Sequence, residues 1–203
     1  MIKIIGILIF SYLLGSIPNG IIISKIFFKI DPTKSGSGNI GATNVYRTAG
    51  KIPGIITLIL DILKGYIPVF LAVKFNFDFQ IVLFSGFLAF LGHLFPVYLK
   101  FKGGKGVATA CGIFIYLTPL AILITAIIFI IVAYIWRYIS LASMISSFLL
   151  PGIIKILIIL KVYNYPDSIV YFAGSIAILI IYKHKANIER LIKGKEFKFG
   201  KNG

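Results

Sequence analysis

The chain has 203 residues, of which 59% are hydrophobic and 13% are charged. Soluble domains are about 45–50% apolar and about 25% charged, so this composition excludes an ordinary soluble domain, and its wealth of Ile, Leu and Phe excludes a disordered chain. The 21 basic and 6 acidic residues give a net charge of +15. In so apolar a chain, this charge favours basic cytoplasmic loops and anionic ligands or lipids over nucleic acid.

Long apolar runs predict the membrane-spanning helices, each of which needs about 20 mainly apolar residues. The clearest runs are 3–24, 51–73, 80–99, 139–160 and 166–182. A further apolar stretch covers 107–136. As one helix it would be roughly 45 Å long against a hydrocarbon core of about 30 Å. The other possibility is two short crossings, broken near Thr118 and Pro119.

The basic residues decide between one crossing and two. If 107–136 crosses twice, most Lys and Arg residues lie on one face of the membrane, in 25–51, in 100–106, at Arg137 and in the tail from Lys183 to Lys201. Cytoplasmic loops carry such an excess. We therefore expect an all-α polytopic membrane protein with seven transmembrane helices, its N-terminus outside and its C-terminus in the cytoplasm. Residues 1–203 are expected to form a single integral membrane domain.

The first cytoplasmic segment, 34–47, has the composition of an anion-binding loop. Glycine lets backbone N–H groups approach a ligand, hydroxyl and amide side chains add neutral donors, and the guanidinium of Arg47 suits phosphate. The alternative is a flexible polar turn, although a turn has no need of so many donors. The candidate residues that precede Arg47 are Ser35, Ser37, Gly38, Asn39, Gly41, Thr43 and Asn44.

The second segment, 92–109, places a Gly-rich turn directly before an apolar helix. Such a turn presents free N–H groups and the positive end of the helix dipole to an anion. The candidate residues are Gly103, Gly104, Lys105 and Gly106. The alternative is a corner between two helices with ordinary cytoplasmic lysines. His93 lies near the end of the preceding helix and is either part of the site or a hydrogen-bonded structural residue.

The third segment, 182–196, and one pair inside a predicted helix complete the polar features. His184 and Asn187 are three residues apart and share a face if the segment is helical; the alternative is an amphipathic tail on anionic lipid. Asp61 and Lys64 are also three apart, within 51–73. Ionisable residues in a bilayer are costly, so we expect the two to neutralise each other or to support the first segment.

All three segments fall on the same face in the seven-helix topology, which predicts one cytoplasm-facing pocket for phosphate. The six acidic residues are scattered and there is no Cys/His cluster, so we expect no metal and no cofactor. The segments resemble the three motifs of the PlsY family, the bacterial acyl-phosphate:glycerol-3-phosphate acyltransferases. The similar strings, in order, are GSGNIGATNVYRTAG, GHLFPVYLKFKGGKGVAT and HKANIERLIKGKE, and DILKG at Asp61–Gly65 is similar too.

The resemblance implies transfer of a fatty acyl group from acyl phosphate to the 1-hydroxyl of glycerol 3-phosphate, giving lysophosphatidic acid and inorganic phosphate. It implies essential roles for Ser37 and Arg47. It also implies a glycerol 3-phosphate loop at Gly103, Gly104 and Gly106. The remaining implied roles are activity for His184 and Asn187 and structure for Glu196. Either His184 or the donor phosphate could accept the proton of the attacking hydroxyl.

Such an enzyme would be a multi-pass protein of the bacterial inner membrane and would act in phospholipid synthesis. We expect a monomer with the lipid bilayer and no nucleic acid as a partner. The non-enzyme alternative is a membrane transporter of anions or organophosphates. A transporter would favour ligand groups near the middle of the membrane and two related halves, whereas this chain shows no internal repeat and its candidate donors lie in loops.

Overall fold

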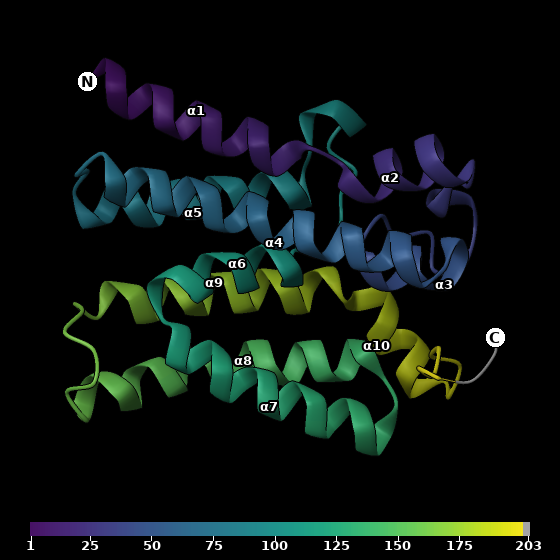
Figure 1. Cartoon of the computed structure of the whole chain (residues 1–203). Coiled ribbons are helices and arrows are strands. Elements are labelled where there is room, and N and C mark those ends of the chain that lie inside the picture. The colour runs from purple at the N-terminus through teal and green to yellow at the C-terminus, as the bar shows by residue number, and fades with distance from the viewer. Residues whose placement is uncertain (201–203) are drawn as a thin grey trace. The chain divides into compact units, whose positions relative to one another are not determined.

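The computed structural model describes residues 1–200, and every regular element among them is a helix (Figure 1). This confirms the all-α fold. The chain divides into two compact units, Met1–Leu117 and Thr118–Gly203. Lys201, which we counted in the basic tail, lies outside the described residues.

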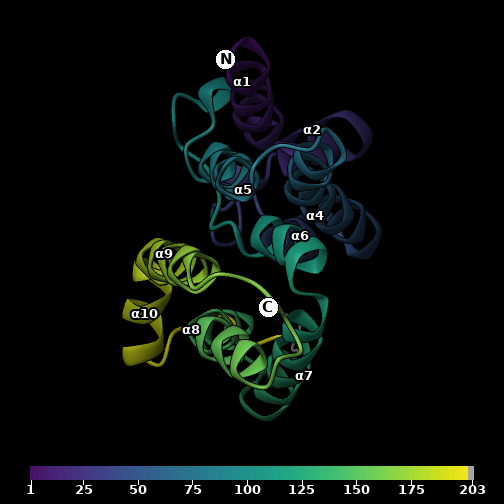
Figure 2. The same cartoon turned by 90° about the vertical axis from the view of Figure 1, so that its left-hand side faces the viewer.

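The first unit is built around one long helix, α4. It comprises α1 (Ile2–Ser16), α2 (Asn19–Phe28), the short 3-10 helix η1 (Pro32–Lys34), α3 (Ala42–Ala49), α4 (Lys51–Lys74), α5 (Phe79–Leu94), the 3-10 helix η2 (Val97–Leu99) and α6 (Val107–Leu117). Helix α4 packs against α2, α3, α5 and α6, and α1 packs along α5 (Figure 2).

Small residues let the long helices of this unit approach closely. A Cβ atom on Gly15 of α1 would meet the backbone of Ala89 in α5, and one on Gly92 of α5 would meet the backbone of α1 at Tyr12. The α4–α6 contact is similar, since a Cβ on Gly65 would meet the Thr109 carbonyl oxygen. Close backbone approach of this kind is how helices associate where apolar side chains gain nothing from leaving lipid.

The span expected over 3–24 is a bent pair of helices and not one continuous helix. Helices α1 and α2 meet at an angle of 44°. The cause is Pro18, which has no N–H group to donate and disfavours helical geometry in the residue before it. Ile17 accordingly has an extended ψ of 118°. Phe95 precedes Pro96 in the same way, so α5 ends at Leu94 instead of near residue 99.

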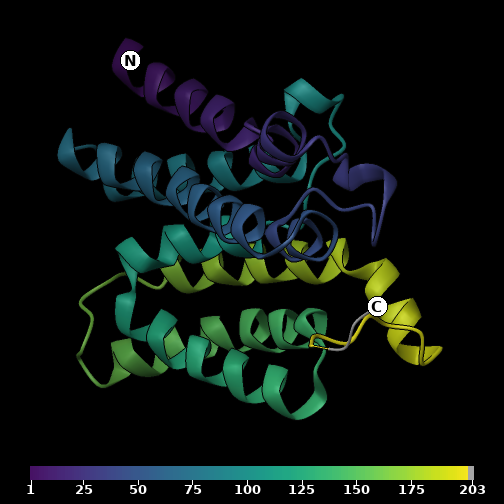
Figure 3. The ribbon, with the colours of Figure 1, turned by 45° about the vertical axis from the view of Figure 1, so that its right-hand side comes forward.

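The second unit contains α7 (Pro119–Trp136), α8 (Ile139–Ile159), α9 (Ser168–Lys183) and α10 (Lys185–Ile192). Helix α8 packs against both α7 and α9 (Figure 3). The break expected near Thr118 and Pro119 is confirmed, since α6 ends at Leu117 and Pro119 opens α7. Proline suits a first helical turn, where its missing N–H would have no partner.

By length and composition, four of the described helices could cross a membrane, or up to six if each bent pair is one span. The bent pairs are α1 with α2 and α9 with α10. Helix α6 is apolar but has 11 residues, which gives a length of roughly 16 Å.

Candidate active site

One asparagine organises the first segment. The side chain of Asn44, on α3, is 2% exposed. Its Oδ1 accepts a hydrogen bond from the Ser37 backbone N–H at 2.8 Å, and its Nδ2 donates to the carbonyl oxygens of Pro32 and Asn39, each at 2.8 Å. The amide is therefore engaged within the loop. This favours a role in shaping the loop over the direct phosphate contact that we predicted for Asn44.

The loop that Asn44 holds ends in a tight turn directly before α3 (Ala42–Ala49). Gly36 and Gly38 have φ values of 60° and 70°, a left-handed conformation that glycine adopts without a Cβ clash. The Gly41 N–H donates to Oδ1 of Asn39 at 2.8 Å, directly before α3 begins. The side-chain oxygen of Asn39 is thus also engaged in the loop.

Helix α3 carries Arg47, the residue of this segment that we predicted to bind phosphate. Arg47, which we expected in a loop, lies on the second turn of α3 and is exposed. Thr43 is four residues earlier, so the two side chains share one side of the helix. The first N–H groups of a helix have no intrahelical partners and lie at its positive end. With Ser35 and Ser37 in the preceding loop, the start of α3 carries the donors that the predicted anion site requires.

Asp31, which we did not single out from the sequence, fixes the backbone at the N-terminal end of this loop. The Asp31 carboxylate accepts from the backbone N–H of Thr33 at 3.0 Å and from its hydroxyl at 2.6 Å, and it pairs with Lys25 at 2.9 Å. The Thr33 hydroxyl and the Lys25 ammonium lower the pKa of Asp31 to about 2. An Asp followed by Pro is a turn signal, so this role could have been read from the sequence.

The second segment packs its glycines against the end of α5. The Gly104 N–H donates to the His93 carbonyl oxygen at 3.0 Å, and a Cβ atom on Gly104 would collide with the His93 imidazole. A Cβ on Gly103 would collide with the His93 carbonyl oxygen. Gly106 has a φ of 82°, and its Cβ would meet the Phe90 ring. From the sequence we expected these glycines to admit a phosphate, and the structure adds an intramolecular reason for them. Lys105, between them, is half-buried.

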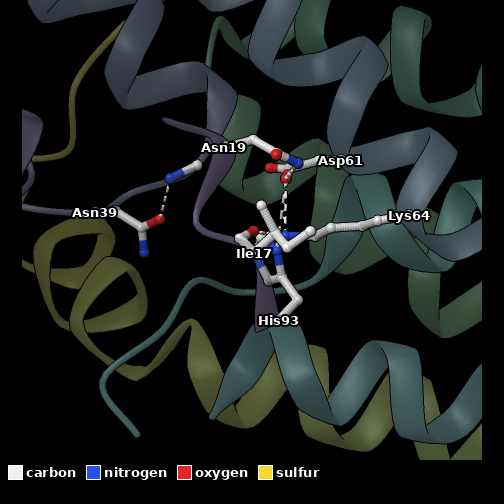
Figure 4. Close-up of polar contacts among 7 residues, drawn as sticks. Ile17, Asn19, Asn39, Asp61, Lys64 and His93 are labelled. Carbon is white, nitrogen blue, oxygen red and sulfur yellow. Dashed lines mark hydrogen bonds and ion pairs between the residues drawn. The ribbon is translucent and has the colours of Figure 1, made fainter. Parts of the chain in front are cut away.

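Four buried polar residues, which we call the buried polar link, lie between the first segment and the glycines of the second: Asn19, Asp61, Lys64 and His93 (Figure 4). Asp61 Oδ1 accepts from Asn19 Nδ2 at 3.0 Å and pairs with Lys64 Nζ at 2.9 Å. Nδ1 of His93 lies 3.9 Å from the same oxygen. The ion pair expected from the spacing of Asp61 and Lys64 is therefore present. Asn19 was missed, although its position after Pro18 marks it as the start of a helix.

The buried polar link connects the two segments through contacts on either side. On one side, a Cβ on Gly20, next to Asn19, would collide with the carbonyl oxygen of Ile40 in the first segment. On the other side, the His93 carbonyl oxygen accepts the backbone N–H of Gly104 in the second segment. The two Gly-rich segments consequently lie at the same end of the first unit.

The third segment lies in the second unit, at the 56° bend between α9 and α10. His184 occupies the bend and is buried, with Nδ1 2.8 Å from the Ile180 carbonyl oxygen. Because a carbonyl oxygen only accepts, this contact places the hydrogen on Nδ1. In the neutral ring, Nε2 is then the nitrogen that can accept a proton.

The Glu196 carboxylate binds three polar side chains of this unit. Its Oε1 accepts from Asn187 Nδ2 at 2.7 Å and from the Ser140 hydroxyl at 3.0 Å. Its Oε2 pairs with Nε of Arg190 at 2.8 Å. The carboxylate thus fixes the side chain of Asn187 on α10 and ties α10 to the start of α8. Ser140 was not among the residues singled out from the sequence.

The candidate residues therefore form two groups, each described within its own unit. The first unit brings together the segments at 34–47 and 92–109 around the buried polar link, and the second unit holds His184, Asn187 and Glu196. Among residues 1–200, no three His, Cys, Asp or Glu side chains cluster as a metal site would require.

The chain matches known proteins over nearly its whole length. The family model described as "Glycerol-3-phosphate acyltransferase" matches residues 5–194. A glycerol-3-phosphate acyltransferase of Fusobacterium nucleatum is 44% identical over 193 residues, covering 95% of this chain and 96% of the relative. The solved structure of PlsY, an integral membrane glycerol 3-phosphate acyltransferase, in its glycerol 3-phosphate form is 40% identical, with a TM-score of 0.88 over 98% of this chain and 96% of that one. Its lysophosphatidic acid form is 42% identical, with a TM-score of 0.83 over the same shares of the two chains. The chain belongs to the glycerol-3-phosphate acyltransferase family.

Proposed function

We propose that this protein transfers a fatty acyl group from acyl phosphate to the 1-hydroxyl of glycerol 3-phosphate, releasing lysophosphatidic acid and inorganic phosphate. The observation that carries the proposal is the pair of Gly-rich segments at one end of the first unit, each beside a cation and the start of a helix. Both substrates of this reaction carry a phosphate, so two anion-binding segments match their chemistry. The solved relatives with glycerol 3-phosphate and lysophosphatidic acid support the acceptor and the product.

As a member of its family, the chain is a multi-pass integral membrane acyltransferase of the bacterial inner membrane, and it acts in phospholipid synthesis. The comparisons lend no support to the transporter alternative. We further propose the seven-helix topology, with α6 and α7 as separate crossings, the N-terminus outside and the C-terminus in the cytoplasm. The excess of basic residues on one face supports this orientation. In this topology 1–203 works as one monomeric membrane domain.

We assign the phosphate contacts to exposed or half-buried groups of the two segments. Arg47 and Ser37, with the N–H groups at the start of α3, bind one phosphate; Lys105 and the N–H groups that follow it at the start of α6 bind the other. Thr43 lies beside Arg47 on α3 and joins the first group. In the second unit, we assign roles in activity to His184 and Asn187, and Glu196 holds Asn187 in place.

The donor is a mixed anhydride and is already activated. The 1-hydroxyl oxygen attacks the acyl carbon, a new ester bond forms, and the bond between the acyl carbon and the phosphate oxygen breaks. The proton of the hydroxyl passes to His184 Nε2 or to the departing phosphate. Because Nδ1 of His184 donates to the Ile180 carbonyl oxygen, Nε2 is the nitrogen on which a neutral His184 would take up this proton.

The test is to assay the purified full-length protein with acyl phosphate and glycerol 3-phosphate, omitting CoA and metal ions. We expect one lysophosphatidic acid and one inorganic phosphate per turnover. Activity that requires acyl-CoA, or that appears only with a divalent ion, would refute the proposal. A protein inactive with any donor but able to move glycerol 3-phosphate across vesicles would support the transporter instead.

A further inference from the structure

The ion pair of Asp61 and Lys64 has no step of its own in the proposed reaction, and its burial needs an explanation. Both side chains are at most 4% exposed. Removing two charges from water costs several kcal/mol per ion, and a buried pair is often no more stable than apolar residues of similar volume. The pair is therefore poorly explained as a means of stabilising the fold. Its position between the two Gly-rich segments suggests another role.

We propose that Asp61, paired with Lys64, is a positioning residue that couples the two segments, so that the first and second phosphate sites keep a fixed alignment. The proposal deepens the proposed function and rests on it. Asp61 reaches the glycines of either segment only through other residues. It acts on the first through Asn19 and on the second through His93.

The branch toward the first segment passes through the break between α1 and α2. Lys64 Nζ donates to the Ile17 carbonyl oxygen at 2.9 Å, and the same oxygen accepts from the Asn19 backbone N–H at 3.0 Å, so the ammonium binds directly at the break. Asn19 Nδ2 donates to Asp61 at the first turn of α2. The two contacts fix the position of α2 on α4. Because Gly20 abuts the Ile40 carbonyl oxygen, a shift of α2 would displace the first segment.

The branch toward the second segment passes through His93, which is 4% exposed. The imidazole lies against the Cα of Gly104, and the His93 carbonyl oxygen accepts the Gly104 N–H. At 3.9 Å, the Asp61 carboxylate acts on the ring through its charge and not through a short hydrogen bond. The charge of Asp61 therefore influences how the His93 ring is oriented. Because the ring contacts Gly104, this orientation also determines the position of the Gly104 backbone.

The experiment is a double-mutant cycle on the two branches, run in two backgrounds. Asn19→Leu removes the hydrogen bond to Asp61 at nearly constant side-chain volume. His93→Asn removes the ring that contacts Gly104. Both are made singly and together, first with the ion pair intact and then in the background Asp61→Asn with Lys64→Met. That background removes both charges at once, since removing one alone would leave the other buried without a partner.

The readouts are kcat and KM for each substrate. With the ion pair intact, we expect each single variant to raise the KM of both substrates. The rise in KM of the double variant should be smaller than the product of the two single rises by about threefold or more, as for residues in one network. In the neutral background the two substitutions should act independently. If the losses multiply independently with the ion pair intact while the proteins remain folded, the coupling proposal is refuted.

Thr57→Val is the matched control. Thr57 lies one turn before Asp61 on the same buried face of α4, and its hydroxyl has no hydrogen-bond partner among the described residues. This variant should keep both KM values. If the neutral background does not fold, the cycle with the ion pair intact still decides the question. A wild-type protein inactive with acyl phosphate would refute the proposed donor alone, and the same cycle would then be read from glycerol 3-phosphate binding by calorimetry.

Discussion

Gly104→Ala tests why the second segment needs glycine. The added methyl group would overlap Nε2 of His93 and lie 2.9 Å and 3.1 Å from its Cε1 and Cδ2 atoms. The ring is buried and cannot swing into solvent, so either it or the Gly-rich turn must move. Overpacking of this kind costs about 1–3 kcal/mol. Expressed wholly in substrate affinity, that is a loss of roughly five- to a hundredfold.

The assay is steady-state kinetics with each substrate varied in turn. We expect the KM for glycerol 3-phosphate to rise more than kcat falls, because the turn moves while the reacting groups stay in place. Gly152→Ala is the control, since a Cβ there meets nothing within 4 Å. Adding His93→Asn to Gly104→Ala should restore part of the affinity by making room. An unchanged KM with collapsed kcat, or no rescue by the second substitution, would refute this reasoning.

Three further predictions concern the other residues of the candidate site. Arg47→Lys should lower activity roughly ten- to a hundredfold, because one charged hydrogen bond worth about 1.5–3 kcal/mol is lost with the bidentate fork; near wild-type turnover would make Arg47 only a topological charge. In a Cys111-free background, single cysteines at Ser37 and Asn164 should react with impermeant reagents from opposite sides of the membrane, and labelling from one side would overturn the seven-helix topology. His184→Gln should retain more activity than His184→Ala if the departing phosphate takes the proton, since glutamine can accept a hydrogen bond but no proton. Equal loss in both variants, with both substrates still bound, would identify His184 as the base.

The helices could be predicted where the apolar runs are uninterrupted. The expected range 51–73 is close to the observed α4, and 139–160 is close to α8. The break within 3–24 was missed because hydropathy averages over Pro18, whose effect on the backbone is local. Arg47 was placed in a loop because Gly and Ser dominate the residues before it, yet the eight residues from Ala42 form a helix once Gly41 caps it.

The composition of the site could be predicted, but its internal contacts could not. Sequence spacing suggested the Asp61–Lys64 pair because residues three apart share a helical face. It could not suggest that Asn19 joins the pair, because that contact depends on how α2 packs on α4. For the same reason, sequence alone assigned Asn44 to phosphate and gave Gly104 only a role in ligand approach. Which partner a polar or small residue meets is decided by packing between distant parts of the chain.

The four hydrogen bonds of Asn44 have a consequence for which sequences can encode this loop. Its carboxamide accepts from Ser37 and donates its two N–H groups to the carbonyl oxygens of Pro32 and Asn39, and the Ser35 carbonyl oxygen, 3.3 Å from Nδ2, shares one of these hydrogens. Aspartate has nearly the same shape but no donors, so it would place a negative charge against three carbonyl oxygens. Serine is too short to reach both the Ser37 N–H and the carbonyl oxygens, and glutamine is longer by a methylene. Asparagine is thus the one genetically encoded side chain that meets every requirement at this position. A saturation library at codon 44, selected for growth that depends on the enzyme, should return asparagine almost alone.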